Sequence, residues 1–257
     1  MLISEGENLS TNLFFHFSIN MRAYDVALAS INAALYALIG YATYLGIFTP
    51  VIGVVRFWPA VIIPAAFAVV FGPKVGGLGA AVGIFISDML IHGNAILSLT
   101  VGVPSNFICF YLIGLLSNLD RLTKFLGLSI SIILQIIYLI ITVYLQCSGL
   151  LPTAATSIFI GVSLFSLIIV IVASKLWKGY LSFMAASTVG LTVGSLIIGF
   201  GLWFFSQFQP LPTGDFSAPI SAIAVWFAWT FLTEAPFLYL AAPPLIEALK
   251  HAFKSSS

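Results

Sequence analysis

Long apolar segments alternate with short polar breaks along almost the whole chain. They predict eight membrane-crossing helices, near residues 24–48, 57–71, 75–91, 97–116, 125–145, 153–176, 180–205 and 217–249. A spanning helix needs roughly 20 apolar residues, and the second and third segments are short by this standard. The pattern predicts an all-α, polytopic transmembrane bundle over residues 24–250, with short polar tails at 1–23 and 251–257.

The composition supports the same class of protein. Hydrophobic residues make up 61% of the chain and charged residues only 7%, whereas about a quarter of the residues in soluble domains are charged. Because so few charges cannot cover a water-facing surface, we expect the lipid bilayer around the bundle. The net charge of +1 gives no indication of a nucleic-acid-binding surface, and we expect no nucleic-acid partner.

The basic residues predict the orientation of the bundle. With eight spans and the N-terminus inside, eight of the nine Lys and Arg residues fall on the cytoplasmic side, and only Arg56 falls outside. Lys and Arg are enriched in the cytoplasmic loops of membrane proteins. We therefore expect a multi-pass protein of the cell membrane with both termini in the cytoplasm.

The stretch 55–94 carries the main candidate chemistry. Arg56 opens its first apolar run, a turn at 72–74 joins the two runs, and Asp88 and His92 close the second run. At roughly 1.5 Å per residue, Arg56 and Asp88 both stand about 21–24 Å from the turn, so we expect them at similar depth. Residues four apart share one helix face, which brings Asp88 and His92 together.

Two interpretations of this polar cluster stay open. In the first, Arg56, Asp88 and His92 contact a ligand, together with Asn94 just beyond them, because ionisable groups at membrane depth usually face a bundle interior or a cavity. In the second, Asp88 only pairs with Arg56 and ties two helices together, while His92 lies among lipid headgroups. Both interpretations expect Arg56 and Asp88 to be paired or liganded, because an unpaired buried charge costs several kcal/mol.

The last apolar segment contributes a second group of candidates. Glu234 is the only acidic residue over most of this segment, and Trp226 and Trp229 precede it. We predict that Glu234 contacts a ligand beneath an aromatic wall; the alternative is a glutamate that only hydrogen-bonds a neighbouring helix. Trp58 and Asn106 complete the set of candidate ligand contacts, with an interfacial tryptophan and an interhelical hydrogen bond as their alternatives.

A stripe of small residues lies in the first segment. Ala29, Ala33 and Ala37 follow each other at four-residue spacing. Such a stripe lets another helix approach closely. It predicts a surface that couples to a partner subunit, and the alternative is ordinary packing inside the same bundle.

Missing motifs argue against catalysis. The chain contains no GxxxxGK[ST], HExxH or GxSxG motif, which would indicate a nucleotide-binding loop, a zinc protease or a hydrolase nucleophile. Cys109 and Cys147 match no metal-binding spacing. We therefore expect a binding or transport role rather than an enzyme, without a cofactor or a bound metal.

Several of these features together resemble the substrate-binding S component of energy-coupling factor transporters. They are the alanine stripe, the arginine–proline opening at Arg56 and Pro59, the hairpin FGPKVGGLGAAVG at 71–83, and Ser87-Asp88. The closing stretch 234–249 also resembles the last helix of that family. The family core has six helices, so the segments 125–145 and 153–176 are candidates for an extra hairpin.

The resemblance implies a function for the chain. It implies capture of a vitamin or related micronutrient from outside, and delivery through a transmembrane coupling subunit that is driven by two ABC ATPases. The stripe of Ala29, Ala33 and Ala37 would then meet the coupling subunit. The competing possibilities are a solitary proton-coupled secondary transporter, in which Asp88 and Glu234 carry protons together with His92, and a membrane scaffold without a transport role.

Overall fold

The computed structural model describes residues 21–45, 51–52, 55–56, 58–117, 121–149 and 153–254. Within these ranges the regular secondary structure is helical except for one short antiparallel ladder, in which β1 (Val51–Ile52) pairs with β2 (Val55–Arg56). Seven helices in the described ranges are long and apolar enough to cross a membrane. This confirms the predicted all-α, polytopic bundle.

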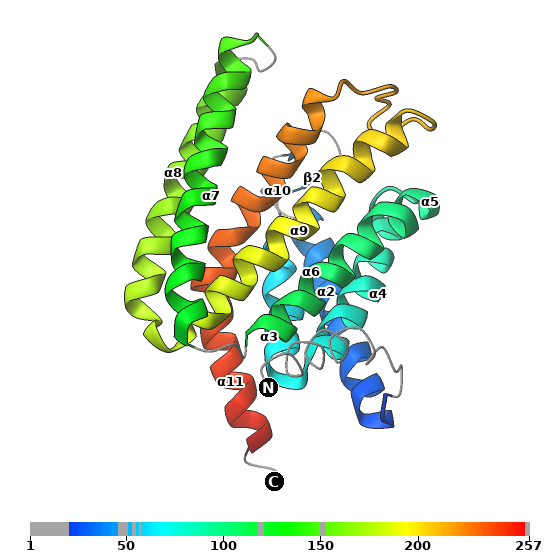
Figure 1. Cartoon of the computed structure of the whole chain (residues 1–257). Coiled ribbons are helices and arrows are strands. Elements are labelled where there is room, and N and C mark those ends of the chain that lie inside the picture. Colours follow the sequence, from blue (N-terminus) through cyan, green and yellow to red (C-terminus); the bar gives the residue numbers. More distant parts are fainter. Residues whose placement is uncertain are drawn as a thin grey trace, which may run out of the picture.

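The helices follow the apolar segments of the sequence closely (Figure 1). The long elements are α2 (Ala23–Leu45), α4 (Pro73–Ile91), α6 (Val103–Leu116), α7 (Arg121–Cys147), α8 (Thr153–Leu176), α9 (Leu181–Ser206) and α10 (Ser221–Leu240). The shorter elements are η1 (Pro59–Val61), α3 (Ile62–Phe71), α5 (Ala95–Leu97), η2 (Ser98–Gly102), η3 (Lys178–Tyr180) and α11 (Ala242–Lys254). The segment predicted at 97–116 is built from α5, η2 and α6 together.

Two of the eight predicted segments lie where they were expected but do not form a single full-length span. The second consists of η1 and α3 over Pro59–Phe71, which is about 20 Å long at 1.5 Å per residue and shorter than the roughly 30 Å hydrocarbon core. The eighth is two helices, because α10 ends at Leu240 and α11 begins at Ala242. Pro243 and Pro244 lie in the first turn of α11. Backbone N–H groups in a first turn have no intrahelical acceptor, so proline costs no hydrogen bond there.

Basic residues gather at one end of the bundle. The start of α2, the α3–α4 turn, the end of α6, the start of α7, the α8–α9 connection and α11 all lie at the end drawn at the bottom of Figure 1. These elements carry Arg22, Lys74, Arg121, Lys124, Lys175, Lys178, Lys250 and Lys254. The end of α7 and the α9–α10 loop lie at the opposite end. The compartment that each end faces stays a prediction.

The turn predicted at 72–74 joins α3 to α4. Gly72 has a φ of +100°, a conformation that glycine adopts without steric cost. Its N–H donates to the carbonyl of Ala68 at 3.1 Å. One helical turn later, a Cβ on Gly76 would collide with the Cβ of Ala68. The glycines therefore allow the short helix α3 to pack tightly against α4.

Two of the three residues in the alanine stripe of α2 lie inside the bundle. Ala33 and Ala37 are buried against α4, with relative exposures of 3% and 5%. A Cβ on Gly83 of α4 would lie 2.8 Å from the Ala33 carbonyl oxygen, and the Ser87 hydroxyl donates to the Ala37 carbonyl at 3.4 Å. The close helix approach serves internal packing at Ala33 and Ala37, whereas Ala29 of the same stripe is half-buried. Coupling of the stripe to a partner subunit stays a prediction.

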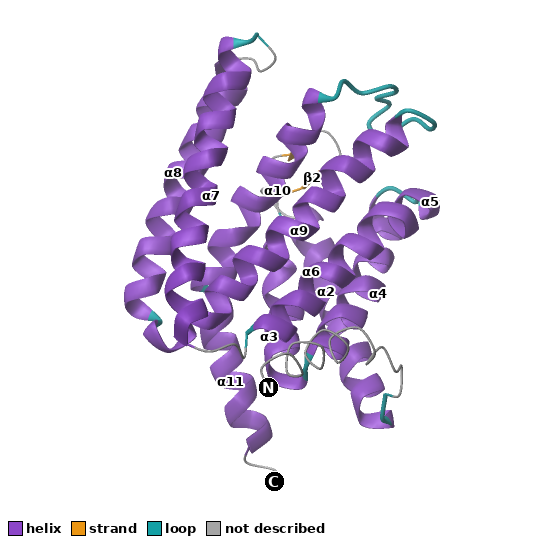
Figure 2. Ribbon diagram, viewed as in Figure 1, coloured by secondary structure: helices purple, strands orange, loops and turns teal. Residues whose placement is uncertain are grey.

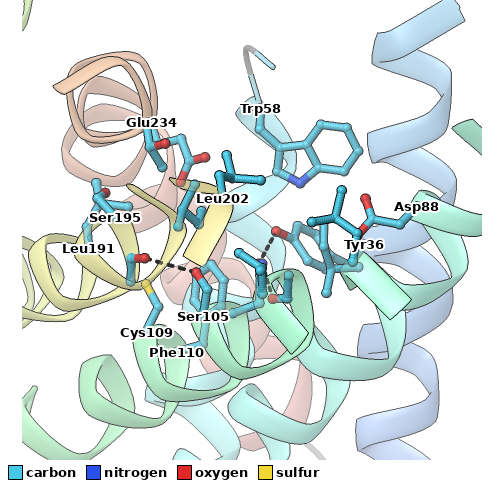
Figure 3. A pocket seen from close by; sticks show the side chains of 18 of the residues that line it. Tyr36, Trp58, Asp88, Ser105, Cys109, Phe110, Leu191, Ser195, Leu202 and Glu234 are labelled. Atoms are coloured by element: carbon cyan, nitrogen blue, oxygen red, sulfur yellow. Dashed lines mark hydrogen bonds between the residues drawn. The ribbon is translucent and has the colours of Figure 1, made fainter. Parts of the chain in front are cut away.

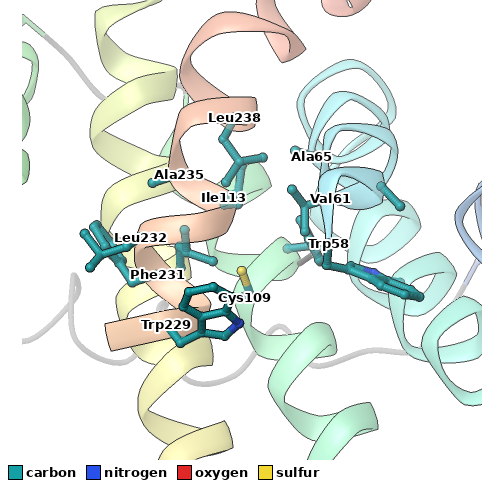
Figure 4. Packing of buried hydrophobic residues seen from close by; sticks show 14 of the residues in the cluster. Trp58, Val61, Ala65, Cys109, Ile113, Trp229, Phe231, Leu232, Ala235 and Leu238 are labelled. Atoms are coloured by element: carbon teal, nitrogen blue, oxygen red, sulfur yellow. The ribbon is translucent and has the colours of Figure 1, made fainter. Parts of the chain in front are cut away.

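The bundle has a central part and a lateral hairpin. Central packing involves α2, α3, α4, α6, α9 and α10, and Figure 4 shows Val61, Ala65, Ile113 and Leu238 within this core. The segments singled out as an extra hairpin form α7 and α8, which pack on α9 and α10 at one edge of the bundle (Figure 2). Ile140 and Ile168 are exposed on this hairpin, as expected for lipid-facing positions.

Candidate functional site

A cavity of about 100 Å³ lies in the central part of the bundle. A single water needs roughly 10–15 Å³, so the cavity has room for several waters or a compact organic molecule. Its walls come from α2, η1, α4, η2, α6, α9 and α10, and the end of α4 that carries His92 borders it (Figure 3). Residues far apart in the sequence thus converge on one partly open cavity.

Asp88 is held in a fixed position on the wall formed by α4. Ser98 donates its hydroxyl to Asp88 Oδ2 at 2.7 Å, and His92 Nε2 lies 3.4 Å from Oδ1. The backbone N–H of Asn94 donates to His92 Nδ1 at 3.1 Å, so the ring proton is on Nε2 and faces the carboxylate. A Cβ on Gly102 would lie 2.8 Å from Oδ2, which explains why glycine occupies that position.

The irregular segment before α6 supplies the partners of Asp88. η2 is a π-helical turn between α5 and α6, and such turns occur frequently at functional sites. Ser98 begins this turn and Gly102 ends it. Asn94 instead caps α5, because its Oδ1 accepts the N–H of Leu97 at 3.0 Å. Asn94, which the sequence predicted as a ligand contact, does not line the cavity.

Asn106 lines the cavity and also joins two helices. The hydroxyl of Tyr36 donates to Asn106 Oδ1 at 2.7 Å, and Asn106 Nδ2 donates to the carbonyl of Gly102 at 2.9 Å. Both interpretations of Asn106 from the sequence thus have structural support. Tyr36 was not expected at the site, although it lies on α2 directly beside Ala37, on the same inward face.

The aromatic wall of the cavity differs from the predicted one. The predicted residue Trp58 lies edge-on to Tyr36 with ring centroids 6.1 Å apart, and Tyr36 lies edge-on to Phe110 at 6.0 Å. Trp226 and Trp229 do not line the cavity. Trp229 packs against Phe159 of α8 with centroids 5.6 Å apart.

Glu234 lines the cavity, as predicted, one helical turn beyond Thr230 on α10. Its relative exposure is 9%, and it has no hydrogen bond or ion pair within the described part of the chain. The Thr230 hydroxyl donates to the Trp226 carbonyl at 2.8 Å instead. A buried carboxylate without a partner is costly, so this group calls for a proton, a water or a ligand.

Helix α9 forms one wall of the cavity. The sequence predicted that the segment 180–205 contributes to the pocket, but it did not predict which residues do so. Leu191, Gly194, Ser195 and Leu202 contribute to the lining, and the Ser105 hydroxyl of α6 donates to the Gly194 carbonyl at 3.0 Å. Their spacing fits one helix face, but apolar and small residues surround all sides of α9, so no face stood out in the sequence.

Arg56 cannot be placed in the site. Its backbone belongs to β2, which contacts α10, but its side chain lies outside the described residues. The predicted pairing of Arg56 with Asp88 therefore stays a prediction.

The residues of the cavity do not resemble a metal centre. Among the described residues, no group of three or more His, Cys, Asp and Glu side chains could hold a metal ion.

Comparison of the chain with protein-family models, curated proteins and solved structures gave no match. The function must therefore be argued from the geometry of the bundle and its cavity.

Proposed function

We propose that this membrane-embedded bundle captures a small organic molecule in the cavity between α2, α4, α6, α9 and α10, as the substrate-capture subunit of an importer of the energy-coupling factor type. One observation carries the proposal: Glu234 faces the cavity with its carboxylate unpartnered among the described residues. Ligand sites are typically apolar concavities with a few placed polar groups, which fits this lining.

The arrangement around the cavity supports binding and release. Ser98 and His92 hold Asp88 in place, and Tyr36 and the Gly102 carbonyl hold Asn106, so this wall is pre-organised before a ligand arrives. Pre-organisation lowers the entropic cost of binding. The opposite wall includes the α10 residue Glu234, two positions before Pro236, which lies inside the same helix.

The import role follows from the resemblance of the hairpin 71–83 and of the stretch 234–249 to S components. In this proposal a vitamin-like micronutrient enters from outside, both termini lie in the cytoplasm, and a transmembrane coupling subunit with two ABC ATPases completes the transporter. Because Ala33 and Ala37 are buried, the coupling subunit contacts Ala29 or another surface of the bundle.

A proton-coupled permease is the second candidate function. The observation that favours it is again Glu234, since an ionisable group facing a cavity at membrane depth can carry a proton during transport. The two functions differ in their energy source.

Reconstituted vesicles distinguish the two functions. We expect the chain to co-purify from its native membrane with a transmembrane subunit and ABC ATPases. Uptake by the reconstituted assembly should require ATP on the side of the vesicle membrane that carries the ATPases. Uptake by the chain alone, driven by a proton gradient and insensitive to ATP, would replace the import-subunit proposal with the permease.

A further inference from the structure

Among the described residues, the acidic side chains that line the cavity have no Lys or Arg beside them. Asp88 and Glu234 both contribute carboxylates, and the described lining residues include neither Lys nor Arg. His92 accepts the N–H of Asn94 at Nδ1 and directs Nε2 toward Asp88, so its ring belongs to the contacts of that carboxylate. The described walls thus present an acidic interior to a bound molecule.

The carboxylates of Asp88 and Glu234 differ in the hydrogen-bond and ion-pair partners that they already have. Asp88 already accepts from Ser98 at 2.7 Å and lies 3.4 Å from His92 Nε2. Glu234 has no such contact over the described ranges, and its side chain is about nine-tenths buried. Figure 3 shows Glu234 on the side of the cavity that also carries Leu202, with Trp58 and Tyr36 nearby. A ligand that enters this space meets the Glu234 carboxylate as its open polar partner.

The remaining walls are suited to the apolar part of such a ligand. Trp58, Tyr36 and Phe110 form a connected set of edge-to-face rings, and Leu202 and Val101 add aliphatic surface. Aromatic faces attract positive charge by about 0.5–2 kcal/mol at ranges within about 6 Å. The ring set therefore favours a cation as well as apolar contact.

We propose that the ligand is a compact organic cation, either a protonated amine or a positively charged nitrogen heterocycle, whose charged nitrogen pairs with Glu234 while its apolar part packs against Trp58 and Tyr36. This inference rests on the proposed binding function and specifies its substrate class. An anionic ligand would face two carboxylates, and with a neutral ligand Glu234 would have to be satisfied by a proton or a water instead of a charge partner.

Three single-ring probes of matched size test the charge preference: benzylamine, benzyl alcohol and benzoate. The full-length chain is purified in detergent, and the thermal unfolding midpoint is followed as each probe is titrated, since a ligand that binds only the folded state raises that midpoint. We expect benzylamine to stabilise the wild-type chain at concentrations at least tenfold lower than benzyl alcohol, and benzoate to have no effect.

Two variants locate the effect. Glu234→Gln keeps the size of the side chain and removes its charge, so the benzylamine preference over benzyl alcohol should fall at least tenfold. Glu247→Gln makes the same chemical change at an exposed position of α11 and should keep the full preference.

The outcomes separate this inference from the proposed function. Stronger binding of benzoate or benzyl alcohol than of benzylamine by the wild-type chain would overturn the cation assignment and leave a binding role intact. The wild-type comparison decides this even if Glu234→Gln does not fold. No response of the folded chain to any of the three probes would count against both the cation assignment and the capture function.

Discussion

Tyr36 of α2 donates a 2.7 Å hydrogen bond to the Oδ1 of Asn106 on α6. Asn106 in turn donates to the carbonyl of Gly102 in η2. The Cα of Gly102 lies close to the Asp88 carboxylate. One polar chain thus connects the first membrane span to the π-helical turn that holds Asp88. The wall of the cavity is built from these few bonds across helices that are otherwise apolar.

Removing the Tyr36 hydroxyl should weaken this wall. Tyr36→Phe keeps the ring contacts with Trp58 and Phe110 but leaves Asn106 Oδ1 without its donor. We expect the free energy of unfolding in detergent to fall by about 1 kcal/mol, the usual net value of such a bond. Tyr144→Phe serves as the matched control at an exposed position of α7, outside the cavity lining. Equal stability of Tyr36→Phe and wild type would show that the bond contributes nothing.

The carboxylate of Asp88 should matter mainly for stability. Asp88→Asn removes the charge that Ser98 and His92 face, and hydrogen bonds to charged groups contribute about 1.5–3 kcal/mol. We expect a loss of that order in unfolding measurements. Ser98→Ala should cost less, and the double variant should lose less than the sum, because both changes break one bond. Strict additivity of the two losses would contradict the contact.

Bulky substitution in the alanine stripe separates packing from docking. Ala33 is buried against α4, so Ala33→Trp should prevent correct folding, since overpacking by even a few methylenes costs about 1–3 kcal/mol. Ala34 is exposed on the neighbouring face, and Ala34→Trp should yield folded protein. Size-exclusion chromatography and thermal unfolding measure both. A well-folded Ala33→Trp chain would restore the idea of a free docking stripe.

Cysteine labelling tests the orientation in the membrane. Native Cys147 is exposed at the end of α7 opposite to the basic residues, whereas Cys109 is buried. We expect a membrane-impermeant maleimide added from outside to label Cys147. In a Cys147→Ser background, Thr213→Cys in the α9–α10 loop should be labelled, and His251→Cys in α11 should be spared. The reverse pattern would invert the predicted topology.

The positions of the spans were readable from the sequence because hydropathy alone sets them. The segment predicted at 153–176 is α8 over the same residues, and the turn at Gly72 appears where glycine and proline break the apolar run. The short ladder of β1 and β2 was missed, because Val51–Arg56 is as apolar as the helices around it. The break at Ala241 was signalled by Pro243 and Pro244 but read as an interruption of a single span.

Which side of each helix faces the cavity was much less predictable from the sequence. Charged and amide groups such as Asp88, His92 and Glu234 were found because they are costly in a membrane and must point inward. The tryptophans of α10 gave no such signal, because that helix is apolar on all sides and its faces cannot be told apart. Trp229 lies one residue before Thr230, about 100° around the helix, and therefore packs toward α8 instead of the cavity.

The most direct test of the central claim is native mass spectrometry of the full-length chain released from its own membranes. We predict that the wild-type protein carries a bound small molecule, that the Glu247→Gln control keeps it, and that the folded Glu234→Gln protein loses it. A small molecule retained equally by all three proteins would show that it binds elsewhere, and a wild-type chain that carries none under conditions that preserve bound lipid would contradict capture in this cavity.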